Sequence, residues 1–476
     1  MGLYYLPSCI TDIKLMTIKN NQVKQNNPVN LLEDPVASTI KRMTIPAVYG
    51  LALLMTFNLV DTFFVSLLGT QALAAISFTF PVTFTVLSLM IGLGIGTSAV
   101  IAKFIGTKDH DSAKYAGTAA LYLAAIIVAC LSFLGYLFVD ELFIVLGAQP
   151  SMLPLIHQYM DIWYLGSVFL IGPMIGNAIL RASGDTKTPS LIMGSSGLVN
   201  AVLDPIFIFG FGPVPAMGIQ GAALATLISW IFAFVLVLHI LINKRQLIHT
   251  GFLPIKTWIL ACRSIIKIGL PAAGANMLTP IAAAIMTAIV ASYGESAVAA
   301  FGVGSRIESI ACLVVLALSM TLPPFMSQNF GARQLDRVGE AYKTAIKFVL
   351  FFQVIIYFIL LLSTSLIASM FAKEQAVAEV IELFIWILPL GYGLQGVIIL
   401  TNSSFNALHK PMMALGLSVL RLFLCYVPLA YLGSYLYGLT GLFVGALVGI
   451  ALMAFISYSA FIKHYNRIVL IAPEKN

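Results

Sequence analysis

The most constraining feature of this sequence is a series of about twelve apolar runs, each about 20 residues long, separated by short polar breaks. A helix of about 20 apolar residues crosses the hydrocarbon part of a bilayer, so each run predicts one membrane-spanning helix. Hydrophobic residues make up 60% of the chain and charged residues only 9%, which excludes an ordinary water-soluble domain. We therefore expect an all-α membrane protein with about 12 transmembrane helices.

Glycines, prolines and charge clusters mark the ends of the expected spans. The first six lie near 43–68, 75–102, 115–138, 155–180, 188–209 and 219–242, and the second six near 264–291, 297–325, 341–370, 378–404, 412–434 and 439–462. The expected organisation is a flexible cytoplasmic tail (1–36), a first lobe (37–242), a linker (243–263), a second lobe (264–463) and a cytoplasmic tail (464–476). Both Met1 and Met16 are candidate start residues.

Basic residues fall on alternate connections between the spans. One set of connections holds clusters of Lys and Arg, whereas Lys373 is the exception on the opposite set. Because basic loops stay in the cytoplasm, we expect a multi-pass protein of a bacterial inner (plasma) membrane with both termini cytoplasmic. The net charge of +7 therefore reflects topology, and we expect the lipid bilayer rather than nucleic acid as a partner.

The two halves of the chain resemble each other. The text GTQALAAISF at Gly69 corresponds to GESAVAAFGV at Gly294, and the same shift of 225 residues takes Pro46 to Pro271. Six spans per repeat is an even number, so both halves have the same orientation and are related by an axis along the membrane normal. This predicts two parallel six-helix lobes around a central cavity.

Two aspartates lie inside expected spans: Asp61 in FNLVDTFFVSLLG and Asp204 in GLVNAVLDPIFIFG. A charge near the bilayer centre costs about 2.5 to 3.5 kcal/mol, and both acids lie at the same depth, about 9 to 12 Å below their outer helix ends. Asn200 shares a helix face with Asp204, and Pro205 leaves the carbonyl of Ala201 without its usual donor. These oxygens suit Na⁺ or one shared proton. The structural alternative is that each Asp bonds a neighbouring helix or caps a helix break.

Three further ionisable residues lie within spans of the second half. Arg306 and Glu308, in GSRIESI, are interpreted first as a buried structural ion pair and second as cavity residues. Arg421 either extends towards the cytoplasm or lines the cavity.

Catalytic motifs are absent from the sequence. There is no HExxH, nucleophile elbow, P-loop lysine pattern or Cys/His metal spacing, and GLGIGTSAVIAKFIG lies within a span, where its glycines favour close helix contacts. We therefore expect a protein that is not an enzyme, uses no cofactor and binds no metal beyond Na⁺. A transporter without a nucleotide-binding domain takes its energy from an ion gradient or from a partner.

Several segments together resemble the multidrug and toxic compound extrusion (MATE) family, from about Lys41 to Ile462: IPAVYGLALLMTFNLVDTFFVSLLG, LRASGDTKTP, NAVLDPIFIFG and PPFMSQNFGARQLDR. The DinF-like branch is more similar than the NorM-like one. The resemblance implies two six-helix lobes, alternating access, and export of amphipathic, often cationic drugs or metabolites against inward H⁺ or Na⁺. We also expect a protein that functions as a monomer.

The resemblance also implies a site. In the DinF-like branch the cation site lies in the first lobe, on the positions of Asp61, Asn200 and Asp204, with Thr226 following in the sixth span. Pro46 matches a first-helix proline that bends as the acid is protonated, and Pro205 is a second expected hinge. The NorM-like branch carries an acidic residue in the seventh span, and this sequence has none there. The 225-residue shift takes Asp61 to Met286, so Asp61 has no acidic counterpart in the second half. Ion coupling is therefore expected in the first lobe alone.

Two alternatives remain. A lipid-linked oligosaccharide flippase of a related class should carry several cationic residues in its cavity, whereas only Arg306 and Arg421 lie well inside spans. A membrane scaffold or intramembrane enzyme would show no gradient-dependent substrate movement.

Overall fold

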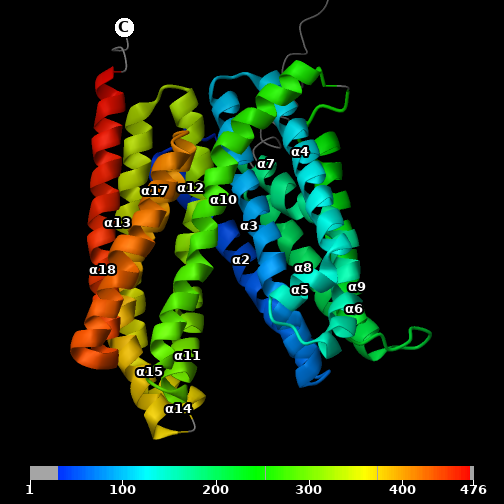
Figure 1. Cartoon of the computed structure of the whole chain (residues 1–476). Helices are drawn as coiled ribbons and strands as arrows, with labels where there is room; N and C mark the ends of the chain where they lie inside the picture. The colour runs from blue at the N-terminus through cyan, green and yellow to red at the C-terminus, as the bar shows by residue number, and fades with distance from the viewer. Residues whose placement is uncertain (1–29, 252, 373, 472–476) are drawn as a thin grey trace, which may run out of the picture.

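The chain folds into two lobes of long helices (Figure 1). The computed structural model describes residues 30–251, 253–372 and 374–471, and these ranges contain helices, short connections and one isolated β-bridge. Met1, Met16 and Lys373 lie outside the described residues.

The first lobe contains six passes. Its α-helices, from α2 to α9, are α2 (Val36–Ser66), α3 (Thr70–Gly106), α4 (His110–Leu137), α5 (Val139–Val145), α6 (Leu153–Gly166), α7 (Asn177–Ala182), α8 (Lys187–Phe209) and α9 (Ile219–His239). Short 3₁₀ and π-helical turns extend α6 and α7 into one composite pass over Pro150–Ala182.

The second lobe repeats this order. Its α-helices are α10 (Ile255–Ala291), α11 (Glu295–Ala311), α12 (Leu313–Gly331), α13 (Leu335–Leu362), α14 (Thr364–Phe371), α15 (Gln375–Ile387), α16 (Tyr392–Ala407), α17 (Pro411–Leu420) and α18 (Val427–Ile471). A π-helix, η7 (Arg421–Tyr426), joins α17 to α18.

The last helical segment accounts for two passes. Among the described residues, 11 stretches are long and apolar enough to cross a membrane, and the last, Pro411–Ile471, is 61 residues long. It folds back at Tyr437 and Gly438, where Gly438 has a φ of +61°, a conformation that favours glycine. On the two sides of the turn, the backbones of Gly433 and Gly441 pack directly against each other. The expected twelve passes in two six-helix lobes are thereby confirmed.

Three expected boundaries differ in the structure. The flexible tail was expected to reach residue 36, but Leu31 is 2% exposed and packs in the core of the second lobe. The expected C-terminal tail begins at 464, but α18 remains helical to Ile471, and α10 already begins at Ile255 within the expected linker. The helical pattern continues past the apolar runs because a helix does not end where the bilayer does.

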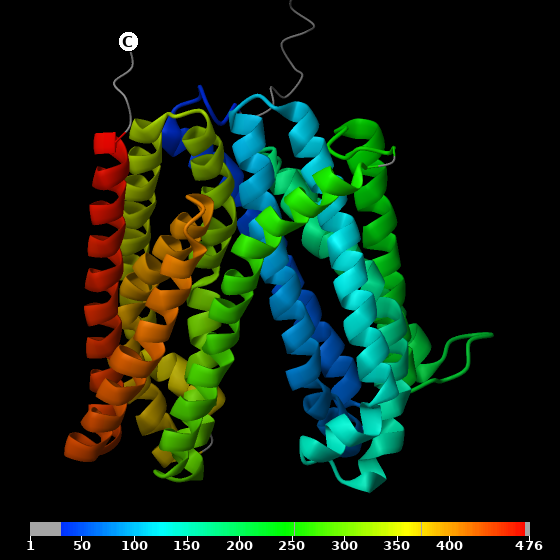
Figure 2. The same ribbon diagram turned by 45° about the horizontal axis from the view of Figure 1, so that its top comes forward.

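The lobes meet at the end where α2 begins and α18 ends, which we call the meeting end (Figure 2). They diverge towards the opposite end, which we call the far end. At the meeting end, Ser327 Oγ on α12 donates to the carbonyl of Ala99 at 2.7 Å, and Gln328 Nε2 donates to the carbonyl of Ala182 at 2.7 Å. Within the described ranges, no hydrogen bond joins the lobes at the far end.

Candidate cation site

Two carboxyl groups from different helices meet inside the first lobe. Helices α2 and α8 approach closely because each carries a glycine at their contact. Gly50 of α2 packs against Ser190 of α8, and Gly197 of α8 packs against the ring of Phe57 of α2. The contact between these helices continues to Asp61 on α2 and Asp204 on α8, whose carboxyl groups lie close enough to interact directly. Carboxylates only accept hydrogen bonds, so a hydrogen bond between the two groups requires a proton on one of them.

Asn200 completes this pair from one helical turn away. Its Nδ2 donates to Oδ1 of Asp204 at 3.1 Å, which fixes the orientation of that carboxyl group. Asp204 is fully buried, and its Oδ2 has no amide or hydroxyl donor among the described residues. The buried oxygen can be satisfied by a proton shared with Asp61 or by a bound cation. The structure thus brings together Asp61, Asn200 and Asp204, as the equal depth of the two acids and the helical spacing of Asn200 predicted.

Thr226, the fourth residue expected at the site, lies on α9. Within the described residues its side chain makes no hydrogen bond to either carboxyl group, and its carbonyl accepts from Ser229 Oγ at 2.7 Å. Ser196 Oγ of α8 donates to the carbonyl of Ser229 at 2.9 Å and so links α8 to α9 beside the site. Thr226 therefore belongs to the helix that supports the site.

The two expected hinge prolines lie inside continuous helices. Pro46 is in the first third of α2 and Pro205 follows Asp204 directly in α8. Both helices run on past their proline, although each proline removes one backbone donor. A hinge at either position remains a prediction.

Sequence reasoning missed Tyr159. This residue of α6 lies close enough to Asp61 and Asp204 to interact electrostatically with both carboxyl groups. Tyrosine is common in membrane spans, so nothing in the sequence distinguished it; only the packing of α6 beside the site does. Its hydroxyl joins the amide of Asn200 as a polar group near the carboxyl pair.

The ion pair expected between Arg306 and Glu308 is wrong. Within the described residues Arg306 forms no ion pair, whereas Glu308 accepts a hydrogen bond from Gln395 Nε2 at 2.9 Å. Two residues apart on a helix, the side chains point to different faces. Glu308 instead interacts electrostatically with Arg421, the first residue of the π-helix, so these two groups form a polar cluster inside the second lobe.

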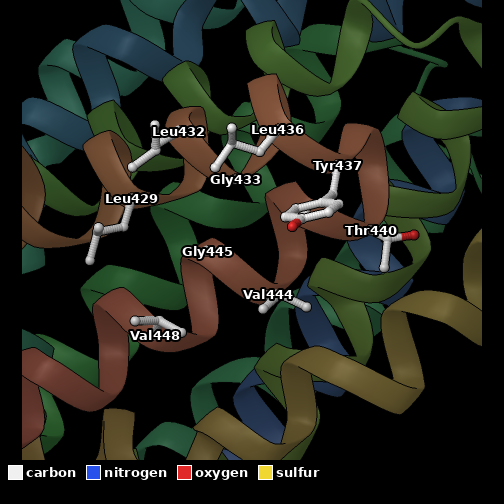
Figure 3. Close-up of a pocket in the computed structure, with 10 residues that line it drawn as sticks. Leu429, Leu432, Gly433, Leu436, Tyr437, Thr440, Val444, Gly445 and Val448 are labelled. Carbon is white, nitrogen blue, oxygen red and sulfur yellow. The ribbon is translucent and has the colours of Figure 1, made fainter.

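A separate apolar groove of about 470 Å³ lies between the two arms of the α18 hairpin (Figure 3). Its lining includes Leu432, Tyr437, Thr440 and Val448. No predicted site residue lines it, so it is not the candidate cation site.

The same sequence profile, that of the MatE family, matches both halves of the chain, at residues 46–206 and 271–432. The chain belongs to the MatE family. The two matches begin 225 residues apart, so they confirm the internal duplication. Together with its apolar passes, membership makes the chain a multi-pass membrane transporter rather than an enzyme.

Relatives of this MatE transporter carry two kinds of name. The FAD transporter of Shewanella oneidensis is 42% identical, over 90% of this chain and 95% of that protein. The probable multidrug resistance protein YoeA of Bacillus subtilis is 25% identical, over 84% of this chain and 89% of that protein. The first name states a transported substrate, FAD, and the second states resistance to multiple drugs.

Solved structures of the family share the fold. The Vibrio cholerae MATE transporter VcmN in the bent form is 33% identical, with a TM-score of 0.86, and the match covers 91% of this chain and 97% of that one. A MOP superfamily transporter from Pyrococcus furiosus is 26% identical, with a TM-score of 0.85, over 93% of this chain and 99% of that one.

Proposed function

We propose that this MatE transporter is a secondary active exporter driven by inward H⁺ movement through Asp61 and Asp204. The observation that carries the proposal is the close approach of the carboxyl groups of Asp61 and Asp204, from two different helices, inside the first lobe. A shared proton lowers the charge of the pair, and intramembrane acids in transporters mark ion pathways. The positions of these residues also match the DinF-like pattern. Na⁺ is the alternative coupling ion, because carboxylate and amide oxygens also suit it.

The proposed cycle couples the ion to the substrate by competition between conformations. A cation entering from outside binds the first lobe better in the state that releases substrate, and so shifts the population towards it. A cation with equal affinity for both states would leave their relative populations unchanged. The carboxyl pair is suited to this role because loss of its proton places two negative charges side by side, which favours a different arrangement of α2 and α8.

We place the meeting end of the lobes in the cytoplasm of a bacterial cell, at the inner membrane. Basic loops cluster at that end, as the alternation of Lys and Arg in the sequence requires. In this orientation the far end, where the lobes diverge, faces outward. The conformation is then the one in which the cation site can exchange with the outside.

For the substrate we propose a flavin dinucleotide first. The 42% identity to a protein named FAD transporter supports this choice over the 25% identity to a probable multidrug resistance protein. Amphipathic cationic drugs are the second candidate and are favoured by those more distant relatives. Both are aromatic and amphipathic, and they differ in the sign of their charge.

The coupling is tested with purified protein in proteoliposomes that carry an imposed pH gradient. We expect Asp61→Asn and Asp204→Asn each to abolish gradient-driven transport while leaving the protein folded. The matched control is Asp111→Asn, which neutralises an exposed acid in the first turn of α4 and should transport normally. Normal transport by both site variants would rule out the carboxyl pair as the coupling site.

The ion is identified by imposing H⁺ and Na⁺ gradients separately on the same vesicles. We expect the H⁺ gradient alone to drive export. Transport driven by Na⁺ at constant pH would instead assign the site to Na⁺. FAD and a cationic dye are offered in parallel, and movement of the dye without FAD would reverse the order of the two substrate candidates.

A further inference from the structure

Arg306 is a charged side chain well inside a span and lies in α11, the helix that begins the eighth pass at the far end. It follows Glu295, the first residue of α11, by about 16 Å along the axis. A charge at such a depth costs about 2.5 to 3.5 kcal/mol when it faces lipid, so its surroundings decide whether it has a function.

The side of α11 opposite Arg306 is covered by the second lobe. Ala297, Ala300 and Phe301 are buried there, and the ring of Phe301 packs edge-on against Phe384 of α15. At 100° per residue, Arg306 points directly away from this packed side. Arg306 is exposed accordingly.

The exposed side of α11 is small and polar. Besides Arg306 it presents Ala299, Gly302 and Ser309, and the space around Gly302 is open to at least 4 Å; Ile310 is the one large apolar residue at its edge. A lipid-facing side would present large apolar residues instead. Figures 1 and 2 show α10 and α11 on the side of the second lobe that faces the first. The exposed side of α11 that carries Arg306 therefore suits a water-filled space between the lobes rather than lipid.

Arg306 also lacks a compensating acid. Within the described ranges no carboxylate lies within ion-pair distance of it. Glu308, the nearest acid on the same helix, is held by Gln395 and interacts with Arg421 from the other side of the helix. The second lobe thus compensates the charge of Arg421 and leaves that of Arg306 available.

We propose that Arg306 binds the phosphate groups of an anionic substrate and selects phosphorylated flavins over neutral ones. This rests on the proposed function, and it adds the residue that sets specificity. A guanidinium offers donors in a planar fork that matches two phosphate oxygens at once. The carboxyl pair of the first lobe repels a pyrophosphate, so its counter-charge comes from the second lobe.

The test compares FAD, FMN and riboflavin transport by full-length protein in proteoliposomes. We expect Arg306→Gln to raise the KM for FAD about tenfold or more, as the loss of charge-assisted hydrogen bonds predicts, with a smaller effect on FMN and none on riboflavin. Arg306→Lys keeps the charge without the planar guanidinium, so its KM for FAD should lie between those of the wild type and Arg306→Gln. Arg467→Gln, an exposed arginine near the end of α18, is the control and should match the wild type.

Two outcomes would overturn the inference, and they are distinguishable. Equal FAD kinetics in the wild type and Arg306→Gln would remove the inference and leave FAD export intact. Failure of the wild-type protein to move FAD, while it moves a cationic dye, would remove the proposed substrate together with the inference. A single symmetric peak in size-exclusion chromatography for each variant separates a loss of binding from a loss of folding.

Discussion

Asn329 of α12 and Leu31, which precedes α2, are joined by a hydrogen bond of 3.0 Å from the Asn329 Nδ2 to the Leu31 carbonyl. Arg337 of α13 extends this contact: its Nε donates to Oδ1 of Asn329 at 2.9 Å, and its NH2 donates to the carbonyls of Leu31 and Asp34 at 3.1 and 2.6 Å. The residues before α2 are therefore held by the second lobe.

Removal of the Arg337 side chain should loosen the meeting end. Arg337→Ala deletes three donated hydrogen bonds, each worth about 1.5 to 3 kcal/mol when the donor is charged. A cysteine placed at the fully buried Ser327 should then react with a maleimide at least about tenfold faster in a background without the native cysteines. Arg333→Ala, at an exposed neighbouring arginine, is the control. Unchanged labelling in Arg337→Ala would contradict the role of this contact.

Gly106 should be required for the lobes to meet. A Cβ at this position would collide with the backbone carbonyl of Gln328 on α12. Gly106→Ala is expected to shift the protein towards conformations that are open at the meeting end, seen as a longer spin-label distance between α3 and α12. Gly416→Ala, where a Cβ has open space, should leave the distance unchanged and stabilise the helix slightly. Equal distances in both variants would refute the prediction.

His409, in the connection between α16 and α17, should make the protein sensitive to acid. Burial, together with the positive charges of Lys103 and Lys267, lowers the pKa of His409 to about 4. The unfolded state then binds more protons between about pH 6.5 and 4, so stability falls as the pH is lowered through this window. By pH 5 the loss should be about 1 to 2 kcal/mol.

The variant that tests this is His409→Asn, because the position has a φ of +57° that asparagine tolerates. We expect the drop in apparent Tm between pH 7.5 and pH 5 to be smaller in the variant than in the wild type. Identical drops would assign the acid sensitivity to other groups.

Asp109 should stabilise the start of α4. Its side chain accepts a hydrogen bond from the backbone N–H of Ser112 at 3.0 Å. Interaction with the Ser112 side chain, and then with this N–H, lowers the pKa of Asp109. Asp109→Ala should cost about 1 kcal/mol at neutral pH. Because the folded-state pKa is depressed, the contribution is present above the unfolded pKa of about 3.9 and is lost as the pH falls below it. Thermal unfolding of the wild type and Asp109→Ala in detergent, at pH 7 and pH 3, measures the loss of stability at each pH. An equal loss at the two pH values would be inconsistent with a charged cap.

Much of the frame follows from the sequence because it depends on local patterns. Length and hydropathy predict the passes, and the repeated text places the second lobe on the first. The pairing of Asp61 with Asp204 was predictable because two acids at equal depth in one lobe have strong reasons to meet.

The rest depends on packing, which no local pattern encodes. Tyr159 joins the site only because α6 lies beside it. The conformation of residues 30–35 is held by hydrogen bonds from Arg337, which is about 300 residues away in the sequence. The ion pair expected for Arg306 and Glu308 is wrong for a related reason: the partner of Glu308 and the exposure of Arg306 depend on how other helices pack around α11. Gln395, which binds Glu308 instead, comes from a distant helix.

Helix α2 belongs to both lobes. Val36, Ile40 and Met43 pack in the core of the second lobe, whereas Asp61 meets Asp204 in the first, and Pro46 lies between these two regions. The lobes are therefore not two independent rigid bodies joined by a linker. Any rotation of one against the other must either bend this helix or pull its first turns out of the second lobe, so protonation and gating act on a single continuous piece of backbone.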